Sequence, residues 1–138
     1  MSVAISMVSL MPCAFKELTG LQVRIDEVMY APQLDAPPER PYPFVYYITI
    51  DNQSDETVTI KGRKWVVTDD EGGCIVVEGD GVVGKFPRLE PGEKFSYNSC
   101  HTIASDSVAE GSYIGVNEEG TPILTRIPRF EMKVPQRS

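Results

Sequence analysis

The residues best suited to binding a ligand form a glycine-rich motif, G-D-G-V-V-G, at residues 79–84. A G-x-G-x-x-G motif binds the pyrophosphate of a dinucleotide where it joins a strand to a helix whose N-terminus faces the phosphates. Here Pro87 follows soon after the motif and Pro91 comes next, so no long helix can begin there. The motif therefore does not predict a dinucleotide-binding fold.

A weaker form of anion binding stays open, because successive backbone amides in a glycine loop can bind an anion without a helix. The ligand would be pyrophosphate or a nucleotide, and the residues predicted to hold it are Gly79, Gly81, Gly84, Lys85 and Arg88. Glu78 and Asp80 lie in the same stretch and oppose an anion by their charge. The alternative is that the glycines only allow the loop to pack closely.

Catalysis requires a nucleophile, a base or a metal, and few residues offer one. The single histidine, His101, directly follows Cys100, but adjacent residues of a strand point to opposite faces and cannot readily pair. A transition metal would need Cys74 as a third ligand, and no local spacing supports that set. The acidic turn at residues 69–71 lacks the calcium-loop pattern and would hold magnesium weakly. We therefore predict no enzyme activity, no cofactor and no metal site.

The elements that position these residues are β-strands, because the apolar residues alternate with a period of two. Residues 44–50 show the clearest alternation in the chain. Residues 63–68 carry the only tryptophan, Trp65, which we expect to anchor the core because an indole buries a large apolar area. Gly62 predicts a bulge just before it.

Turn residues divide the remaining chain into further short strands. Acidic and glycine residues at 69–73 and 117–120 predict two hairpins, and the proline-rich segment 31–43 is expected to be an extended loop. Residues 99–110 are polar and are expected to be irregular, and Pro128 is expected to interrupt a strand. About eight short strands without an amphipathic helix of normal length predict an all-β protein, an antiparallel β-sandwich.

Length and composition define the domain organisation and exclude some classes of partner. The 138 residues suit one domain, predicted at residues 20–138 behind a flexible N-terminal extension of residues 1–19. The net charge is −7 and no basic run occurs, so nucleic acid and anionic membranes are not expected partners. No apolar run reaches the roughly 18 residues that cross a bilayer. Three cysteines without paired spacing are typical of a reducing cytoplasm.

A series of motifs between Gln22 and Val134 resembles the ApaG family. The motifs are Arg63-x-Trp65, Thr68-Asp69, the glycine motif, Pro87-x-Leu89-x-Pro91-Gly92-Glu93-x-Phe95-x-Tyr97, Gly111-Ser112-Tyr113 and Ile127-Pro128-x-Phe130. The resemblance implies a β-sandwich of the immunoglobulin or fibronectin type III kind, cytoplasmic and often dimeric. It also implies a link to cobalt and magnesium efflux. Related domains in F-box and polymerase-interacting proteins imply a role as an interaction module.

The chain departs from the family's pattern in two places. Glu78 stands where the family often has a basic residue before the first glycine. Ser107, Ala109 and Glu110 stand where the family often has a glycine, a methionine and a basic residue. Both changes remove positive charge or backbone freedom near the predicted anion site, which weakens the expectation of phosphate binding.

The preferred hypothesis is a non-catalytic protein-interaction or regulatory domain that is linked only indirectly to divalent-cation homeostasis. Its partner is unidentified, and its binding surface is expected at a sheet edge or at apolar residues of the glycine loop, Val82, Val83 and Phe86. The alternative is a phosphate or nucleotide sensor, and a hydrolase of such ligands has the least support. A homodimer is also predicted, through the pairing of sheet edges such as Phe44–Ile50.

Overall fold

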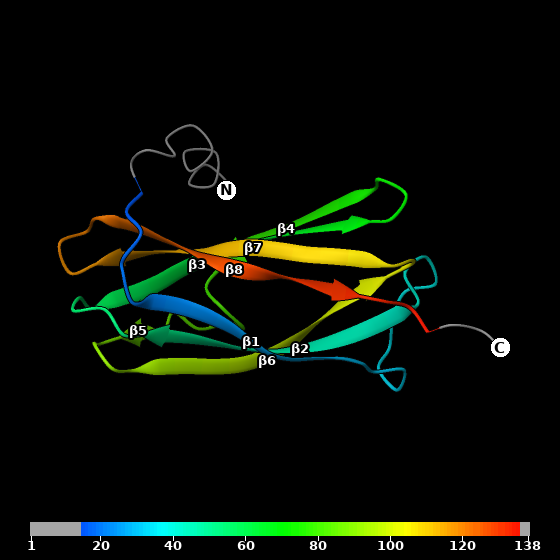
Figure 1. Cartoon of the computed structure of the whole chain (residues 1–138), viewed down its shortest axis with the longest axis horizontal. Helices are drawn as coiled ribbons and strands as arrows, with labels where there is room; N and C mark the ends of the chain where they lie inside the picture. The colour runs from blue at the N-terminus through cyan, green and yellow to red at the C-terminus, as the bar shows by residue number, and fades with distance from the viewer. Residues whose placement is uncertain (1–14, 136–138) are drawn as a thin grey trace.

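The structure is a computed structural model that describes residues 15–135. Its eight strands are β1 (Leu21–Tyr30), β2 (Tyr42–Asn52), β3 (Val58–Asp69), β4 (Cys74–Asp80), β5 (Arg88–Leu89), β6 (Lys94–Ile103), β7 (Ser107–Asn117) and β8 (Pro122–Met132). They form two antiparallel sheets that face each other (Figure 1), one in the order β1-β2-β6 and the other in the order β4-β3-β7-β8, with β5 paired to β3. The all-β antiparallel sandwich predicted from the sequence is confirmed.

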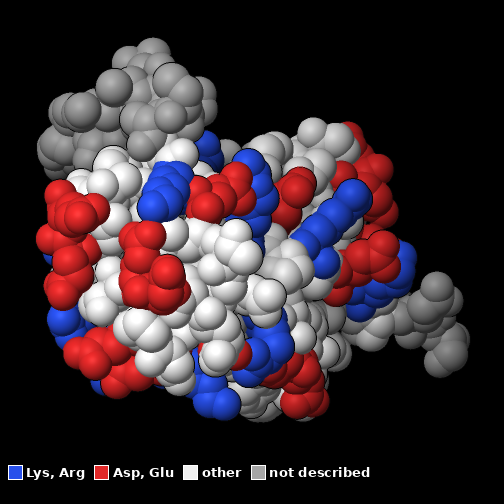
Figure 2. Space-filling model, turned by 60° about the vertical axis from the view of Figure 1, so that its left-hand side comes forward, with Lys and Arg blue, Asp and Glu red and all other residues white. Residues whose placement is uncertain are grey.

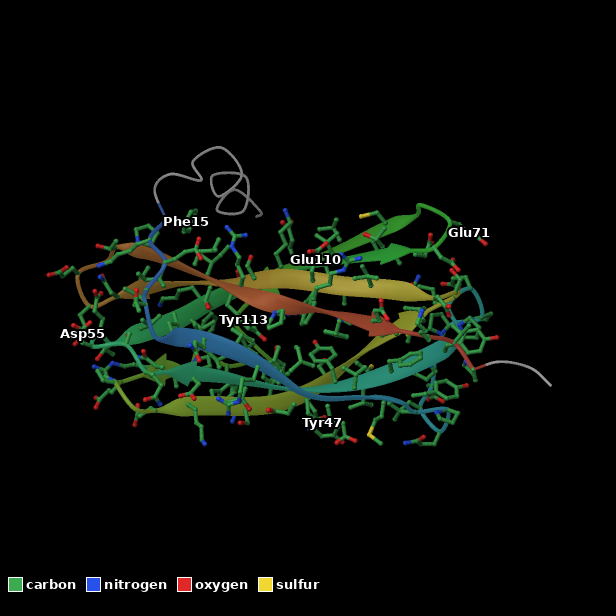
Figure 3. The ribbon with its side chains drawn as sticks, viewed as in Figure 1. Phe15, Tyr47, Asp55, Glu71, Glu110 and Tyr113 are labelled. Carbon is green, nitrogen blue, oxygen red and sulfur yellow. The ribbon has the colours of Figure 1, made fainter. Side chains whose placement is uncertain are left out.

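The core lies between the two sheets and is built from the alternate residues of each strand. In β2, Ile48 and Ile50 are fully buried, as the period-two pattern predicts. Trp65 of β3 is 1% exposed, and its ring lies 5.0 Å from the ring of Tyr46 in β2. The predicted role of Trp65 as a core anchor is confirmed. Figure 3 shows Tyr113 between the sheets.

The bulge predicted at Gly62 is confirmed by a register shift between Ile60 and Gly62 where β3 pairs with β7. Ile60 and Trp65 are both buried, although an odd number of positions separates them. A regular strand would direct these two side chains to opposite faces, and one extra residue in the bulge brings both to the core. The bulge therefore lets β3 run as one strand.

A second bulge explains why Pro128 does not end a strand as expected. The register of β7 and β8 shifts between Ala109 and Gly111, so that β8 contains the extra residue beside Pro128. A bulge leaves part of the hydrogen-bond ladder unpaired and therefore tolerates a proline, which has no amide hydrogen. Ile127 and Phe130, on either side of it, are both buried.

Two expectations about strand placement are wrong. Residues 99–110 are not irregular, because β6 continues to Ile103 and β7 begins at Ser107. Polar residues such as His101 occupy inward positions there, which hides the strand pattern. The segment Phe44–Ile50 is not a free edge, because β2 pairs with β1 on one side and β6 on the other. Edge pairing of two copies through this segment is therefore ruled out, and a homodimer through another surface stays a prediction.

The predicted N-terminal extension covers residues 1–19, and its residues 1–14 lie outside the described part of the chain. Beyond that point the chain is attached to the edge of β8. The amide of Lys16 donates to the carbonyl oxygen of Pro122 at 3.0 Å, and the amide of Leu124 donates to the carbonyl oxygen of Lys16 at 3.0 Å. Within residues 15–135, no helix is long and apolar enough to cross a bilayer.

Candidate functional site

The glycine motif forms a tight turn after β4. The amide of Val82 donates to the carbonyl oxygen of Lys85 at 2.8 Å, and the amide of Lys85 donates back to Val82 at 2.9 Å. Val83 and Gly84 at the tip both have positive φ, 42° and 79°, as a primed hairpin turn requires. The amide of Gly81 donates to the carbonyl oxygen of Lys61 at 2.7 Å. Three amides of the loop are therefore engaged within the protein, which leaves fewer for an anion.

Packing accounts for two of the three glycines of the motif. Gly81 has a φ of +65°, and a Cβ there would overlap the carbonyl oxygen of Lys85. Gly79 lies beneath the guanidinium of Arg63, and a Cβ there would be 2.8 Å from Arg63 Nη1. Gly81 is required by a close contact with backbone, and Gly79 gives room for the guanidinium of Arg63, which agrees with the alternative to anion binding.

The two basic residues of the predicted anion site line one shallow groove of about 490 Å³ with Lys94 and Phe95. Lys85 and Arg88 are therefore brought together, whereas the three glycines do not line this groove. Arg88 is paired with Glu90 at 2.8 Å and Glu118 at 3.4 Å. The hydrogen bond to Glu90 raises the pKa of Arg88 and uses part of its charge. Anion binding at this loop stays a prediction.

The apolar residues of the loop do not share one environment. Val83 and Phe86 are exposed as expected, at 47% and 54%. The expectation that Val82 is exposed is wrong, because it is fully buried in the core. The tight turn directs Val82 inward and leaves only the tip in solvent. Val82 therefore cannot contribute to a partner surface.

A larger apolar surface, which sequence reasoning missed, lies on β4. Ile75, Val76 and Val77 are 43%, 52% and 38% exposed, and β4 pairs with β3 alone. The hairpin of β3 and β4 leans away from the three-stranded sheet in Figure 1. We call the open side of β4 at residues 75–77, where the strand has no neighbour, the β4 edge. An apolar run is typical of a buried strand, so the sequence offered no signal that β4 is exposed.

The inner face of β4 forms one wall of a groove of about 430 Å³, which we call the β4–β6 groove. Its lining residues are Arg40, Tyr46, Arg63, Trp65, Val67, Ile75, Val77, Ser99, Cys100, His101 and Thr102. The groove exists because the sheet that contains β4 has one strand more along its path than the sheet that ends at β6.

The floor of the β4–β6 groove holds His101 between two aromatic rings. Its imidazole is stacked on Tyr46 at 4.9 Å and meets Trp65 edge-on at 4.7 Å. Burial lowers the pKa of His101 to about 4, so the imidazole is neutral at physiological pH. His101 Nε2 and Trp65 Nε1 are buried and have no hydrogen-bond partner in the described structure.

Three tyrosines form a hydroxyl cluster next to this floor. Tyr97 and Tyr113 are hydrogen bonded through their hydroxyl groups, and Tyr46 lies beside them. Burial raises the pKa of all three phenols, so they stay protonated at physiological pH and are poor proton acceptors.

Cys100 is exposed, on the opposite face of β6 from His101, as the alternation of a strand predicts.

Charged groups show no segregation on the face drawn in Figure 2, where lysine and arginine side chains alternate with acidic ones. Within residues 15–135, no three His, Cys, Asp or Glu side chains gather in a way that could hold a metal ion. The apolar β4 edge and the β4–β6 groove are therefore the features considered below, together with the groove lined by Lys85 and Arg88.

Comparison with known proteins adds an independent line of evidence. The family model for the ApaG domain matches residues 32–117. Protein ApaG of Methylococcus capsulatus is 36% identical over 118 residues, 85% of this chain and 93% of the relative. Protein ApaG of Brucella abortus is 38% identical over 119 residues, 86% of this chain and 91% of the relative. The crystal structure of a Bordetella pertussis protein called ApaA has a TM-score of 0.75 at 31% identity and covers 89% of this chain and 99% of that one.

Proposed function

The chain belongs to the ApaG family, and from that premise we propose that it is a non-catalytic domain that binds a protein partner along the β4 edge. The observation that supports this function is the exposure of three consecutive apolar residues, 75–77, on a strand with one unpaired side. Exposed edge strands invite pairing with another chain, and natural proteins usually protect them with charges, prolines or bulges. Residues 75–77 carry none of these.

The backbone of β4 is arranged to accept an added strand. The amide of Asp69 donates to Gly73 at 2.9 Å and the amide of Gly81 donates to Lys61 at 2.7 Å, which places bonded pairs at both ends of the β3–β4 ladder. Because bonded and non-bonded pairs alternate in an antiparallel ladder, Val76 lies at a non-bonded pair with Val66. Its amide and carbonyl therefore point to the open side, where a partner strand would bind them.

Charge favours a partner strand with basic ends over a second copy of this chain. Acidic turn residues 69–71 precede β4, and Glu78 and Asp80 lie at its other end. Antiparallel pairing of two β4 strands would bring acidic ends together, and like charges across a ladder are destabilising. If light scattering at millimolar concentration detects a dimer that Val76→Asp dissociates, the partner is a second copy instead.

Site-specific photo-crosslinking tests this surface directly. A photoreactive residue is placed at position 76, and at position 47 as the matched control. Tyr47 is 38% exposed and lies on the outer face of the other sheet (Figure 3). We expect position 76 to give a discrete protein adduct that position 47 does not give. Identical adducts from both positions, or none from position 76, would contradict the proposal.

The partner identified by crosslinking then allows a quantitative test. Calorimetry with that purified partner is expected to show at least about a tenfold loss of affinity for Val76→Asp, because a charge is placed in the middle of an apolar interface. The control Tyr47→Asp adds the same charge elsewhere and is expected to leave the affinity unchanged. Equal losses in both variants would indicate a general charge effect.

A phosphate or nucleotide sensor is the second candidate function. The observation that favours it is that three basic residues and one acidic residue line one groove beside the glycine loop, Lys85, Arg88 and Lys94 with Glu93. Titration with pyrophosphate or ATP would then shift the amide resonances of residues 79–88 in a saturable way. Unchanged resonances over that range would remove this candidate.

The remaining parts of the proposal concern compartment and phenotype. The exposed free thiols of Cys74 and Cys100 fit the reducing cytoplasm as the place of action. An association with cobalt and magnesium would act through the bound protein partner. Deletion of the domain and the Val76→Asp variant should then give the same cation phenotype, whereas a normal phenotype for Val76→Asp would separate cation handling from the β4 edge.

A further inference from the structure

The β4–β6 groove has an unusual balance of charge for this protein. The chain has a net charge of −7, yet two arginines and no aspartate or glutamate line this groove. Arg40 is partly engaged, because its Nε donates to Thr102 Oγ1 at 3.2 Å and its Nη1 lies 3.8 Å from Glu39. Arg63 has no carboxylate within 4 Å among residues 15–135. The groove therefore presents an unpaired positive charge.

The guanidinium of Arg63 is held in place by the start of the glycine motif. Its Nη1 donates to the carbonyl oxygens of Asp80 at 3.0 Å and Gly81 at 3.1 Å. It rests on Gly79, where a Cβ would lie 2.8 Å from Nη1 and would make the guanidinium move. These contacts use one nitrogen, so the rest of the planar guanidinium is left for another acceptor. A planar, fixed guanidinium suits two-point binding of a carboxylate.

Apolar residues form the walls beside this charge. Val67 of β3 and Ile75 and Val77 of β4 line the groove, and the two β4 residues keep about two fifths of their surface exposed. The volume of about 430 Å³ lies within the range of pockets that bind small molecules, roughly 300–1,000 Å³. An anion that also carries an apolar group would cover these walls, whereas inorganic phosphate would not.

The floor also contains two buried polar atoms without hydrogen-bond partners among the described residues. Trp65 is 1% exposed, and its Nε1 has no hydrogen-bond partner, nor does the buried Nε2 of His101. Buried polar atoms nearly always have a partner, so each exception calls for an explanation. Both atoms are almost fully covered, so a polar ligand group in the groove would reach them only with a local shift of the floor.

We propose that the β4–β6 groove binds a carboxylate attached to an apolar or aromatic group. The carboxylate pairs with Arg63, and the apolar group lies against Val67, Ile75 and Val77. Two sources supply this chemistry, a free small acid and the C-terminal carboxylate of a protein chain. The site is distinct from partner binding on the open side of β4, so that either proposal can fail while the other holds.

The chain carries its own reporters for this site, because it has one tryptophan and one histidine and both line the groove. Phenylacetate is the probe, and phenylacetamide is the uncharged control of nearly the same shape. Phenylacetate is expected to change Trp65 fluorescence and to shift the His101 imidazole resonances with one common saturation curve. Equal binding of phenylacetamide, or no saturable change with phenylacetate, would overturn the proposal.

Two variants localise the charge that binds the probe. Arg63→Met is expected to weaken phenylacetate binding at least about tenfold, because it removes a charge-assisted pair of hydrogen bonds. Lys64→Met removes the same charge from the opposite face of β3 and is expected to change the affinity less than about twofold. Equal weakening by both variants, or no effect of Arg63→Met, would contradict the assignment. If Arg63→Met fails to fold, the comparison of phenylacetate with phenylacetamide on the unmodified protein still tests the proposal.

Further arms of the titration identify the source of the carboxylate. A short peptide that ends in phenylalanine is offered with a free and with an amidated C-terminus. Tighter binding of the free peptide than of phenylacetate indicates a protein C-terminus, whereas the reverse indicates a small acid. Competition by inorganic phosphate as strong as that by phenylacetate would show that the groove selects charge alone and would overturn the proposed class. Val76→Asp is expected to leave phenylacetate binding unchanged, which separates this site from the proposed partner surface.

Discussion

Strands β2 and β4 have similar apolar sequences but differ in how deeply they are buried. Residues 44–50 form the centre of a sheet, and Ile48 is fully buried there. Residues 74–77 form the edge of the other sheet, and Ile75 is 43% exposed. The difference comes from the neighbours that each strand finds, two for β2 and one for β4. An apolar strand is therefore a core element in one place and an exposed sheet edge in another.

The largest expected difference comes from the same substitution in the two strands. Ile48→Ala should lower the free energy of unfolding by about 2–5 kcal/mol, because it leaves a cavity in a packed core. Ile75→Ala should lower it by less than about 1 kcal/mol, because the residue is already 43% exposed and lies at the edge of the sheet. Urea denaturation of both variants measures this contrast. Similar losses would mean that β4 is covered in the folded protein.

The pH dependence of stability tests the burial of His101 in the core. Burial lowers the pKa of His101 to about 4, whereas an exposed histidine titrates near 6.5. Between these values the unfolded chain binds a proton that the folded chain does not, so stability falls as the pH falls, by about 2–3 kcal/mol. Urea unfolding at pH 7 and pH 4.5 measures the change, and His101→Gln should abolish most of it.

Two carboxyl groups affect stability only at the lower end of this pH window. Hydrogen bonds lower the pKa of Asp51 and Glu56, so any stability that they contribute is lost only as the pH falls through about 4 and below. A fall in stability between pH 6.5 and 4.5 that persists in His101→Gln would show that His101 is not the buried group responsible.

The boundary between the buried and the exposed region runs through the glycine motif. Gly81 and Gly84 both have positive φ, but a Cβ at Gly81 would overlap Lys85, whereas the space around Gly84 is open. Gly84→Ala should cost about 1 kcal/mol through backbone strain alone. Gly81→Ala should cost at least about 2 kcal/mol, because the collision adds to the strain. Thermal unfolding compares them, and equal costs would contradict the packing role of Gly81.

The smallest expected effect on stability comes from the β4 edge itself. Val76→Asp should change the free energy of unfolding by no more than about 0.5 kcal/mol, because the side chain is 52% exposed. The same variant should weaken partner binding at least about tenfold, so folding and binding are separated in one measurement series. A loss of several kcal/mol in urea denaturation would place Val76 in the stabilising core and refute its role as a free edge.

Local patterns in the sequence predicted much of the fold. The alternation over residues 44–50, the anchoring role of Trp65 and the bulge at Gly62 are each confirmed. Such features depend on the direction of neighbouring side chains along one strand, which the period of two reveals. His101 was harder to place, because a polar residue at an inward position breaks the pattern on which the prediction relies.

The candidate sites could be predicted only in part. Val83 and Phe86 were expected at the surface and are exposed, whereas Val82 is buried. Neither the apolar edge of β4 nor the groove beside it was predicted, because both depend on how far one sheet extends past the other. Arg63 shows the same limit, since its contact with Gly79 joins residues of different strands.

By itself, the sequence determined the class of fold and the residues that share a face of each strand, because both follow from interactions between near neighbours in the chain. The tertiary structure alone decided that β2 is central, that β4 is an edge and that Arg63, Trp65 and His101 meet in one groove. Those outcomes depend on pairing between strands that are distant in the sequence, and the period of two is the same for a strand with one neighbour or with two.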